Sequence, residues 1–133
     1  MNTFFTYNNN RHKTSKAKGY FINLLNNDGS ISKLIKSISP DIVVNTAAYQ
    51  SVDYCEEEKN MAYLLHVKST EEISSACLET SSKLIHFSSN FVFDGKKGFY
   101  NEDDHPNPIS YYGKTRLDAE KIVLKSSPKN VVL

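Results

Sequence analysis

Short apolar runs alternate with segments of helical periodicity along most of this 133-residue chain. The two clearest runs are Asp41–Asn45 and Lys83–Ser88, which are predicted to be buried strands. Between them, a long segment from near Asp53 to Thr80 is predicted to be helical, with Ala62, His66, Ser69 and Ile73 on one face. Two strands joined by a crossover helix run parallel in one sheet. The alternation therefore predicts an α/β fold with a partial doubly wound parallel sheet and a site at the carboxyl ends of its strands.

The other predicted elements continue this alternation. A short strand is predicted at Gly19–Ile22, and a helix with Ser30 as its N-cap carries four apolar residues at helical spacing (Ile31, Leu34, Ile35 and Ile38). Pro40 ends that helix. A last strand is predicted over Asn130–Leu133, after a last helix over Tyr111–Ser126 that carries one stripe of Tyr112, Arg116, Ala119 and Val123.

The bulk composition excludes several classes of protein. A net charge of +1 with 39% hydrophobic and 23% charged residues argues against nucleic-acid or membrane-surface binding driven by charge. No apolar run reaches the length of a membrane span, and the first residues do not form a secretory signal. Cys55 and Cys77 lack a metal-ligand spacing and are predicted to be reduced thiols on a helix. We expect a cytoplasmic protein.

A site for carbonyl reduction is predicted where the strand Lys83–Ser88 ends. Ser88 and Ser89 follow its apolar run, and Tyr112 and Arg116 stand four residues apart at the start of the next helix, on one face. A tyrosine can donate a proton to a developing alkoxide, and a neighbouring cation stabilises the phenolate that remains. A serine hydroxyl can hold the carbonyl oxygen. These residue types therefore fit the reduction of a ketone.

Five segments, taken together, carry a resemblance to a known family. They are PDIVVNTAAY (Pro40–Tyr49), VDYCEEE (Val52–Glu58), HFSSNFVFDG (His86–Gly95), Glu102-Asp103, and NPISYYGKTRLDAEK (Asn107–Lys121). Their order and spacing resemble the extended short-chain dehydrogenase/reductase family and, within it, the dTDP-4-dehydrorhamnose reductases. The resemblance extends to the non-catalytic subunit of methionine adenosyltransferase, which uses the same Rossmann scaffold without relying on reductase chemistry.

The resemblance implies reduction of a nucleotide-linked 4-keto-6-deoxy sugar, with NADP or NAD as the cofactor. By this resemblance Tyr112 is the proton donor, Ser89 holds the oxygen with Ser88 as the alternate, and Arg116 takes the place of the YxxxK lysine. The implied cofactor-binding residues are Asn23, Asn45, Ala47, Ala48, Tyr112 and Arg116, and the implied substrate-binding residues are Asn90 and Phe91. For Asn45–Ala48, a tight strand-to-helix connection is an equally weighted alternative.

The sequence also departs from the family pattern. The motif reads YxxxR instead of YxxxK, and residues 1–19 contain one glycine, Gly19, where the family has a glycine-rich cofactor loop. Residues 1–19 are therefore predicted to be a polar, poorly ordered segment, and residues 20–133 a partial Rossmann-like domain without the glycine-loop unit or a C-terminal substrate lobe. We expect weak or absent cofactor binding. The alternative to an impaired reductase is a non-catalytic binding or regulatory module, or a decayed fragment.

Three further predictions concern single features. His66 stands where the family usually has an asparagine, and a packed side chain is favoured over a new catalyst. Glu102, Asp103 and Asp104 precede His105; a solvated loop is favoured over a metal site, and no metal ligand is assigned. An incomplete sheet would expose edges and an apolar face, which predicts self-association or a partner chain covering them.

Overall fold

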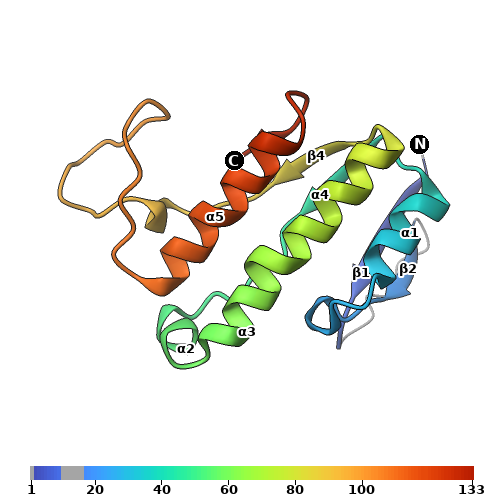
Figure 1. Ribbon diagram of the computed structural model, residues 1–133, viewed down its shortest axis with the longest axis horizontal. Coiled ribbons are helices and arrows are strands. Elements are labelled where there is room, and N and C mark those ends of the chain that lie inside the picture. Colours follow the sequence, from blue (N-terminus) through green and yellow to red (C-terminus); the bar gives the residue numbers. More distant parts are fainter. Residues whose placement is uncertain (1, 10–16) are drawn as a thin grey trace.

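The computed structural model describes residues 2–9 and 17–133, which form a layer of parallel strands covered by a layer of helices (Figure 1). In chain order the elements are β1 (Thr3–Tyr7), β2 (Ala17–Phe21), the 3-10 helix η1 (Leu24–Asn26), α1 (Ser30–Ile38), β3 (Ile42–Asn45), α2 (Val52–Glu57), α3 (Lys59–Tyr63), the π-helical turn η2 (Leu64–Lys68), α4 (Ser69–Thr80), β4 (Lys83–His86), the 3-10 helix η3 (Asn90–Val92), α5 (Tyr111–Ser126) and β5 (Val131–Val132).

All strand pairs in the described part of the chain are parallel. β1 pairs with β2, and separately β4 lies between β3 and β5 in a three-stranded sheet. The register aligns Asn45 of β3 with His86 of β4, and His86 in turn with Val132 of β5. The predicted α/β class and partial parallel sheet are therefore confirmed.

The two faces of the β3–β4–β5 sheet have different surroundings. Helices α4 and α5 lie side by side over one face, and α1 lies next to α4 in front of β1 and β2 (Figure 1); Leu84 of β4 belongs to one buried cluster with residues of all three helices. On the opposite face Ile42 and Val44 are about half exposed (54% and 55%), as is Phe87, which follows β4. The prediction that Asp41–Asn45 is a buried strand is therefore wrong for this face. The reason is that the described helices pack on one side only.

The N-terminal strands differ from the sequence-based expectation for residues 1–19. Thr3–Tyr7 and Ala17–Phe21 form strands β1 and β2, where a polar and poorly ordered segment is predicted as far as residue 19. Aromatic side chains hold the pair together, with ring contacts between Phe4 and Tyr20 and between Tyr7 and Phe21. Residues 10–16, between the two strands, lie outside the described residues.

Helix α1 confirms the prediction of an amphipathic helix ended by Pro40. Ile31 and Ile35 are buried in the core, as their spacing indicates. Its start differs from the prediction: the N-cap is Gly29, in a left-handed conformation, rather than Ser30. The carboxylate of Asp28 instead accepts a hydrogen bond from the Ser30 N–H (3.0 Å), so an acidic group satisfies a free donor at the helix start.

The predicted long helix is present but interrupted. Glu58 leaves helical geometry between α2 and α3, and a π-helical turn, η2, separates α3 from α4. The buried stripe expected from the sequence is confirmed, since Ala62, His66, Ser69 and Ile73 are all nearly inaccessible to solvent. A π-helical turn widens the backbone spiral locally, which is uncommon and frequently marks a functional position.

Helix α5 approaches the segment after β4 very closely at Gly113. A Cβ atom built at this position would collide with the Phe91 carbonyl oxygen and would lie 3.0 Å from Cβ of Pro108. The predicted stripe of Tyr112, Arg116, Ala119 and Val123 is buried on the same helix. Gly113 therefore sets how near η3 lies to the buried face of α5.

This close approach predicts that Gly113→Ala destabilises the protein by about 1–3 kcal/mol, although alanine is the better helix former by about 1 kcal/mol. Urea denaturation would measure the free energy of unfolding. Gly98→Ala is the matched control, because no atom lies within 4 Å of a Cβ at that loop position. We expect a change below about 0.5 kcal/mol for the control. Equal stabilities for the two variants would contradict the steric argument.

Candidate functional site

Tyr112 and Arg116 lie one turn apart on the buried face of α5, as their spacing predicts. Tyr112 is 9% exposed, and its ring is held between two others. Phe91 of η3 contacts it edge-on at a centroid distance of 5.6 Å, and His66 of η2 does so at 5.5 Å. These two perpendicular contacts fix the orientation of the phenol ring near the carboxyl end of β4.

Arg116 is more deeply buried than a lysine-like role in cofactor binding would suggest. It is 2% exposed, and its Nη2 donates a hydrogen bond to the backbone carbonyl oxygen of Phe87. Its Nε and Nη1 groups have no hydrogen-bond partner among the described residues. Burial lowers the pKa of the guanidinium, although an arginine side chain remains charged at neutral pH. Arg116 therefore ties α5 to the end of β4.

The hydroxyl groups of both predicted serines are engaged by nearby residues. Ser88 Oγ donates to the Glu120 carboxylate on α5. Ser89 is the N-cap of η3, and its Oγ accepts a 3.3 Å hydrogen bond from the Phe91 N–H. Asn90, predicted to contact substrate, is exposed beside them, as is Phe91. The structure thus gathers these residues at one strand end but gives each serine a protein partner.

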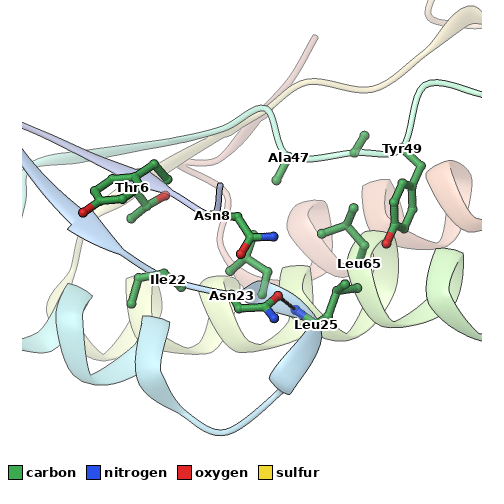
Figure 2. Close-up of a pocket in the computed structure, with 11 residues that line it drawn as sticks. Thr6, Asn8, Ile22, Asn23, Leu25, Ala47, Tyr49 and Leu65 are labelled. Carbon is green, nitrogen blue, oxygen red and sulfur yellow. Dashed lines mark hydrogen bonds between the residues drawn. The ribbon is translucent and has the colours of Figure 1, made fainter. Parts of the chain in front are cut away.

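A pocket of about 270 Å³ lies at the carboxyl ends of β1, β2 and β3 (Figure 2). Figure 2 shows Ala47 and Tyr49 on one side and Asn8, Asn23 and Leu65 on the others. The full lining is Thr6, Tyr7, Asn8, Ile22, Asn23, Leu24, Leu25, Ala47, Ala48, Tyr49 and Leu65. This is the edge of a parallel sheet where ligands bind in open α/β folds.

The predicted cofactor residues do not all face this pocket. Asn23 lines it, but its Oδ1 caps η1 by accepting from the Leu25 N–H (3.1 Å), and its Nδ2 donates to Asn26. Asn45 is buried away from the pocket lining, where its Oδ1 accepts from the Ala47 N–H and its amide nitrogen contacts His86 at 3.2 Å. Tyr112 and Arg116 are also outside the lining.

His66 is packed, as expected, but its contacts were not foreseen. Its Nε2 accepts a 3.0 Å hydrogen bond from the Tyr49 N–H, and its Nδ1 lies 2.8 Å from Thr115 Oγ1 on α5. Sequence analysis missed Thr115, Tyr49 and the Ser88 partner Glu120. A signal was available only for Glu120, which stands four residues after Arg116 on the predicted buried side of the helix.

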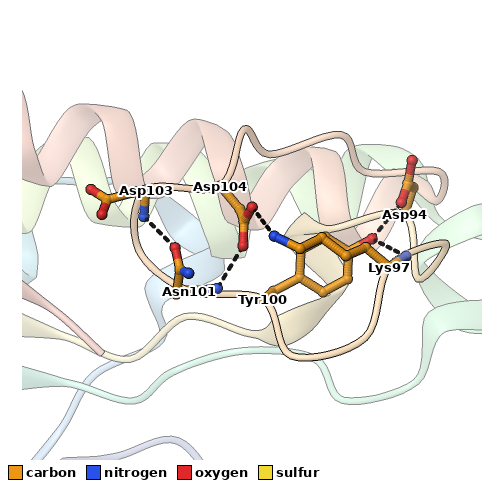
Figure 3. Close-up of polar contacts among 6 residues, drawn as sticks. All are labelled: Asp94, Lys97, Tyr100, Asn101, Asp103 and Asp104. Atoms are coloured by element: carbon orange, nitrogen blue, oxygen red, sulfur yellow. Dashed lines mark hydrogen bonds and ion pairs between the residues drawn. The ribbon is translucent and has the colours of Figure 1, made fainter.

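The acidic loop after η3 is held by its own polar contacts (Figure 3). Asp94 accepts a 2.6 Å hydrogen bond from the Tyr100 hydroxyl, and the Lys97 ammonium pairs with Asp104. Asp94 also accepts from Asn107, and these hydrogen bonds, that of Tyr100 foremost, lower its pKa to about 2. Within residues 2–9 and 17–133, no group of three or more acidic, histidine or cysteine residues could hold a metal ion.

Comparison with known proteins identifies the family. The family model described as the RmlD substrate binding domain matches residues 10–133. The chain belongs to this RmlD family. The predicted resemblance is thereby confirmed. dTDP-4-dehydrorhamnose reductase of Aggregatibacter actinomycetemcomitans is 36% identical over 110 residues, which cover 82% of this chain and 37% of that protein. Methionine adenosyltransferase 2 subunit beta of Xenopus laevis is 35% identical over 121 residues, which cover 90% and 36%.

Solved structures support the same assignment. A hypothetical dTDP-4-dehydrorhamnose reductase from Sulfolobus tokodaii, 30% identical, superposes with a TM-score of 0.88 over 99% of this chain and 54% of that one. A dTDP-4-dehydrorhamnose reductase from Bacillus anthracis, solved in complex with NADP, shares the fold at 24% identity, with a TM-score of 0.82 over 98% and 51%. The chain spans little more than a third of the length of its curated relatives. None of the helices we describe is long and apolar enough to cross a bilayer.

The residues fit a nicotinamide cofactor in part. The small side chains of Ala47 and Ala48 leave room against one wall of the pocket, and near Tyr112 two buried nitrogens of Arg116 have no hydrogen-bond partner in the part of the chain that the structure describes. Asn23 fits less well, because its carbonyl oxygen already caps η1. The part of the site formed by the β3 loop and α5 is therefore the better candidate for holding such a cofactor.

The buried histidines predict an acid-sensitive stability. Burial first, and then the charge of Arg116, lowers the pKa of both His66 and His86 from 6.5 to about 4. The unfolded chain therefore binds more protons than the folded chain between pH 6.5 and 4. The free energy of unfolding should fall by up to about 3 kcal/mol per histidine as the pH falls through this window, with no further loss from these groups below it.

Urea denaturation at pH 7.5, 6.5, 5.5 and 4.5 measures this dependence. Replacing His86 by Gln should reduce the fall in unfolding free energy, whereas replacing the exposed His105 by Gln should leave it unchanged. A wild-type free energy that stays constant from pH 7.5 to 4.5 would show that the buried imidazoles titrate normally.

Proposed function

We propose that this chain contributes the reducing site of an NAD(P)H-dependent reductase for a nucleotide-linked 4-keto-6-deoxy sugar, and that this activity is impaired in the isolated chain. The observation that supports the proposal is Tyr112, clamped between the rings of His66 and Phe91 beside the serines that follow β4. The match of residues 10–133 to a family that includes the dTDP-4-dehydrorhamnose reductases supports the proposed substrate class.

Each residue has a defined role in this proposal. A reduced nicotinamide, when bound, supplies the hydride. Tyr112 donates a proton to the oxygen of the substrate, and Ser89, with Ser88 as the alternate, donates a hydrogen bond to the same oxygen. Ala47 and Ala48 form the wall against which the cofactor lies, and Asn90 and Phe91 contact the sugar.

Two features account for the proposed impairment. One guanidinium nitrogen of Arg116 already donates a hydrogen bond to the Phe87 carbonyl, and its planar group replaces the compact ammonium of a lysine. Residues 1–18 contain no glycine, whereas a close backbone approach to a pyrophosphate group is commonly made by a glycine-rich turn. Cofactor binding weaker than micromolar is the expected result.

The proposal predicts that turnover of a dTDP-4-keto-6-deoxy sugar with NADPH or NADH is slow and depends on Tyr112. Tyr112→Phe should lower it by at least about 100-fold, because the proton donor is lost while the ring contacts remain. Tyr111→Phe, at the preceding position of the same helix, should change it less than threefold. Calorimetry measures the binding of each cofactor, and the fall in absorbance at 340 nm then measures its oxidation.

A non-catalytic binding module is the second candidate, and the engagement of Arg116, Ser88 and Ser89 by protein groups favours it. The similarity to methionine adenosyltransferase 2 subunit beta gives this candidate a precedent in the same family. Absence of cofactor binding at millimolar NADPH and NADH would rule out the reductase and leave the module. Activity that is equal in the two tyrosine variants would reject the assigned role of Tyr112.

We also propose that the open face of the β3–β4–β5 sheet is covered by a second copy of the chain or by a partner chain. Ile42, Val44, Phe87 and Leu133 present their apolar side chains there. No nucleic-acid partner is proposed for a chain with a net charge of +1, and the free, buried Cys55 and Cys77 agree with a cytoplasmic location.

Covering of this face predicts that the purified chain self-associates as its concentration rises, and that Val44→Lys weakens the association at least tenfold. Leu78→Lys is the matched control, because Leu78 is exposed to a similar degree (59%) but lies on α4. Sedimentation velocity over a hundredfold concentration range measures the effect. A wild-type chain that remains monomeric throughout would exclude the second copy.

A further inference from the structure

His66 stands between two parts of the molecule that the proposed site needs together. It belongs to the π-helical turn η2, and the residue before it in that turn, Leu65, lines the pocket. The imidazole is fully buried and contacts the loop after β3 on one side and α5 on the other. A π-helical turn is uncommon and frequently marks a functional position, so its presence at His66 independently indicates a functional role for this residue.

The hydrogen-bond partners of His66 determine where its proton lies. The Tyr49 backbone N–H can only donate, so Nε2 of His66 must be the acceptor (3.0 Å). The proton of the neutral ring is then on Nδ1, which donates to Thr115 Oγ1 (2.8 Å). The Thr115 hydroxyl keeps its own proton for the Tyr112 carbonyl oxygen, 2.8 Å away. Each donor in this series of three hydrogen bonds therefore has one acceptor.

We propose that His66 is a positioning residue that couples the pocket wall to Tyr112 through this chain of three hydrogen bonds. The first links the Tyr49 backbone, which lines the pocket, to the imidazole. The second links the imidazole to Thr115, and the third links Thr115 to the backbone of Tyr112 itself. A ligand that displaces the Tyr49 loop therefore shifts the start of α5.

Ring contacts transmit the same displacement. The imidazole meets the Tyr112 ring edge-on at 5.5 Å and the Tyr49 ring at 6.1 Å, so the three rings form a continuous row. Because the imidazole is buried beside Arg116, its neutral form is favoured, and this keeps Nε2 free to accept from Tyr49. The reading of Tyr112 as the responding group rests on the proposed function. The hydrogen-bonded link itself does not.

Thr115 offers the sharpest test, because valine removes its hydroxyl at nearly constant shape and serine retains it. In protein labelled with ¹⁵N-histidine, wild type and Thr115→Ser should both show His66 protonated on Nδ1. In Thr115→Val that preference should be lost, and the Tyr49 amide hydrogen, at the far end of the link, should exchange at least tenfold faster. A ring protonated on Nε2 in wild type, or unchanged Tyr49 exchange in the valine variant, would overturn the proposal.

A second arm adds NADH or NADPH and follows the ¹³C ring signal of Tyr112, assigned with Tyr112→Phe. Saturating cofactor should move this signal in wild type and Thr115→Ser, and by less than half as much in Thr115→Val. An equal shift in all three proteins would overturn the coupling. If no cofactor binds at millimolar concentration, the proposed reductase fails, while the histidine spectrum and Tyr49 exchange still decide whether the link exists.

Discussion

The close approach of α5 to the end of β4 is the contact on which the rest of the site depends. Arg116 donates to the Phe87 carbonyl, Glu120 accepts from Ser88, and Gly113 leaves space for the Phe91 carbonyl. These contacts join the residues that leave the sheet to one face of one helix. Because Tyr112 lies on that face, the docking of the helix places its ring between Phe91 and His66, whose edge-on contacts then fix its orientation.

A buried guanidinium makes this arrangement costly. Removing a charge from water costs several kcal/mol, and a carbonyl oxygen compensates only part of it. Two further nitrogens of Arg116, Nε and Nη1, lack partners within the described residues, and a buried donor left without a partner typically costs about 1–3 kcal/mol. The segment Phe87–Ser89 must therefore hold a fixed position, so that the Phe87 carbonyl offsets part of the cost of burying the Arg116 guanidinium. The hydrogen bond from Ser88 to Glu120 of α5 holds the same segment in place.

The sequence was sufficient for features with a local period. The apolar spacing in α1 and the stripe from Tyr112 to Val123 follow from helical geometry alone, and both are buried as predicted. Contacts between residues far apart in the sequence could not be predicted from it. His66 and Thr115, in hydrogen-bond contact, are 49 positions apart, and Ser88 and Glu120 are 32 positions apart. The exposure of Val44 was missed for a related reason, because a continuous apolar run predicts a strand buried on both faces and cannot tell that helices cover only one of them.

A family pattern assigns a position but does not show which partner the side chain at that position takes. Asn23 stands at the expected position beside the pocket, yet its carbonyl oxygen serves the short helix that follows it. Asn45 likewise holds the Ala47 N–H and the ring of His86 instead of facing a ligand. In both cases the position of the side chain suggests a contact with the cofactor, but its oxygen accepts a hydrogen bond from a nearby backbone N–H. A free backbone N–H at a strand end is always present, whereas a ligand is not, so such side chains stabilise the loop before they can bind anything.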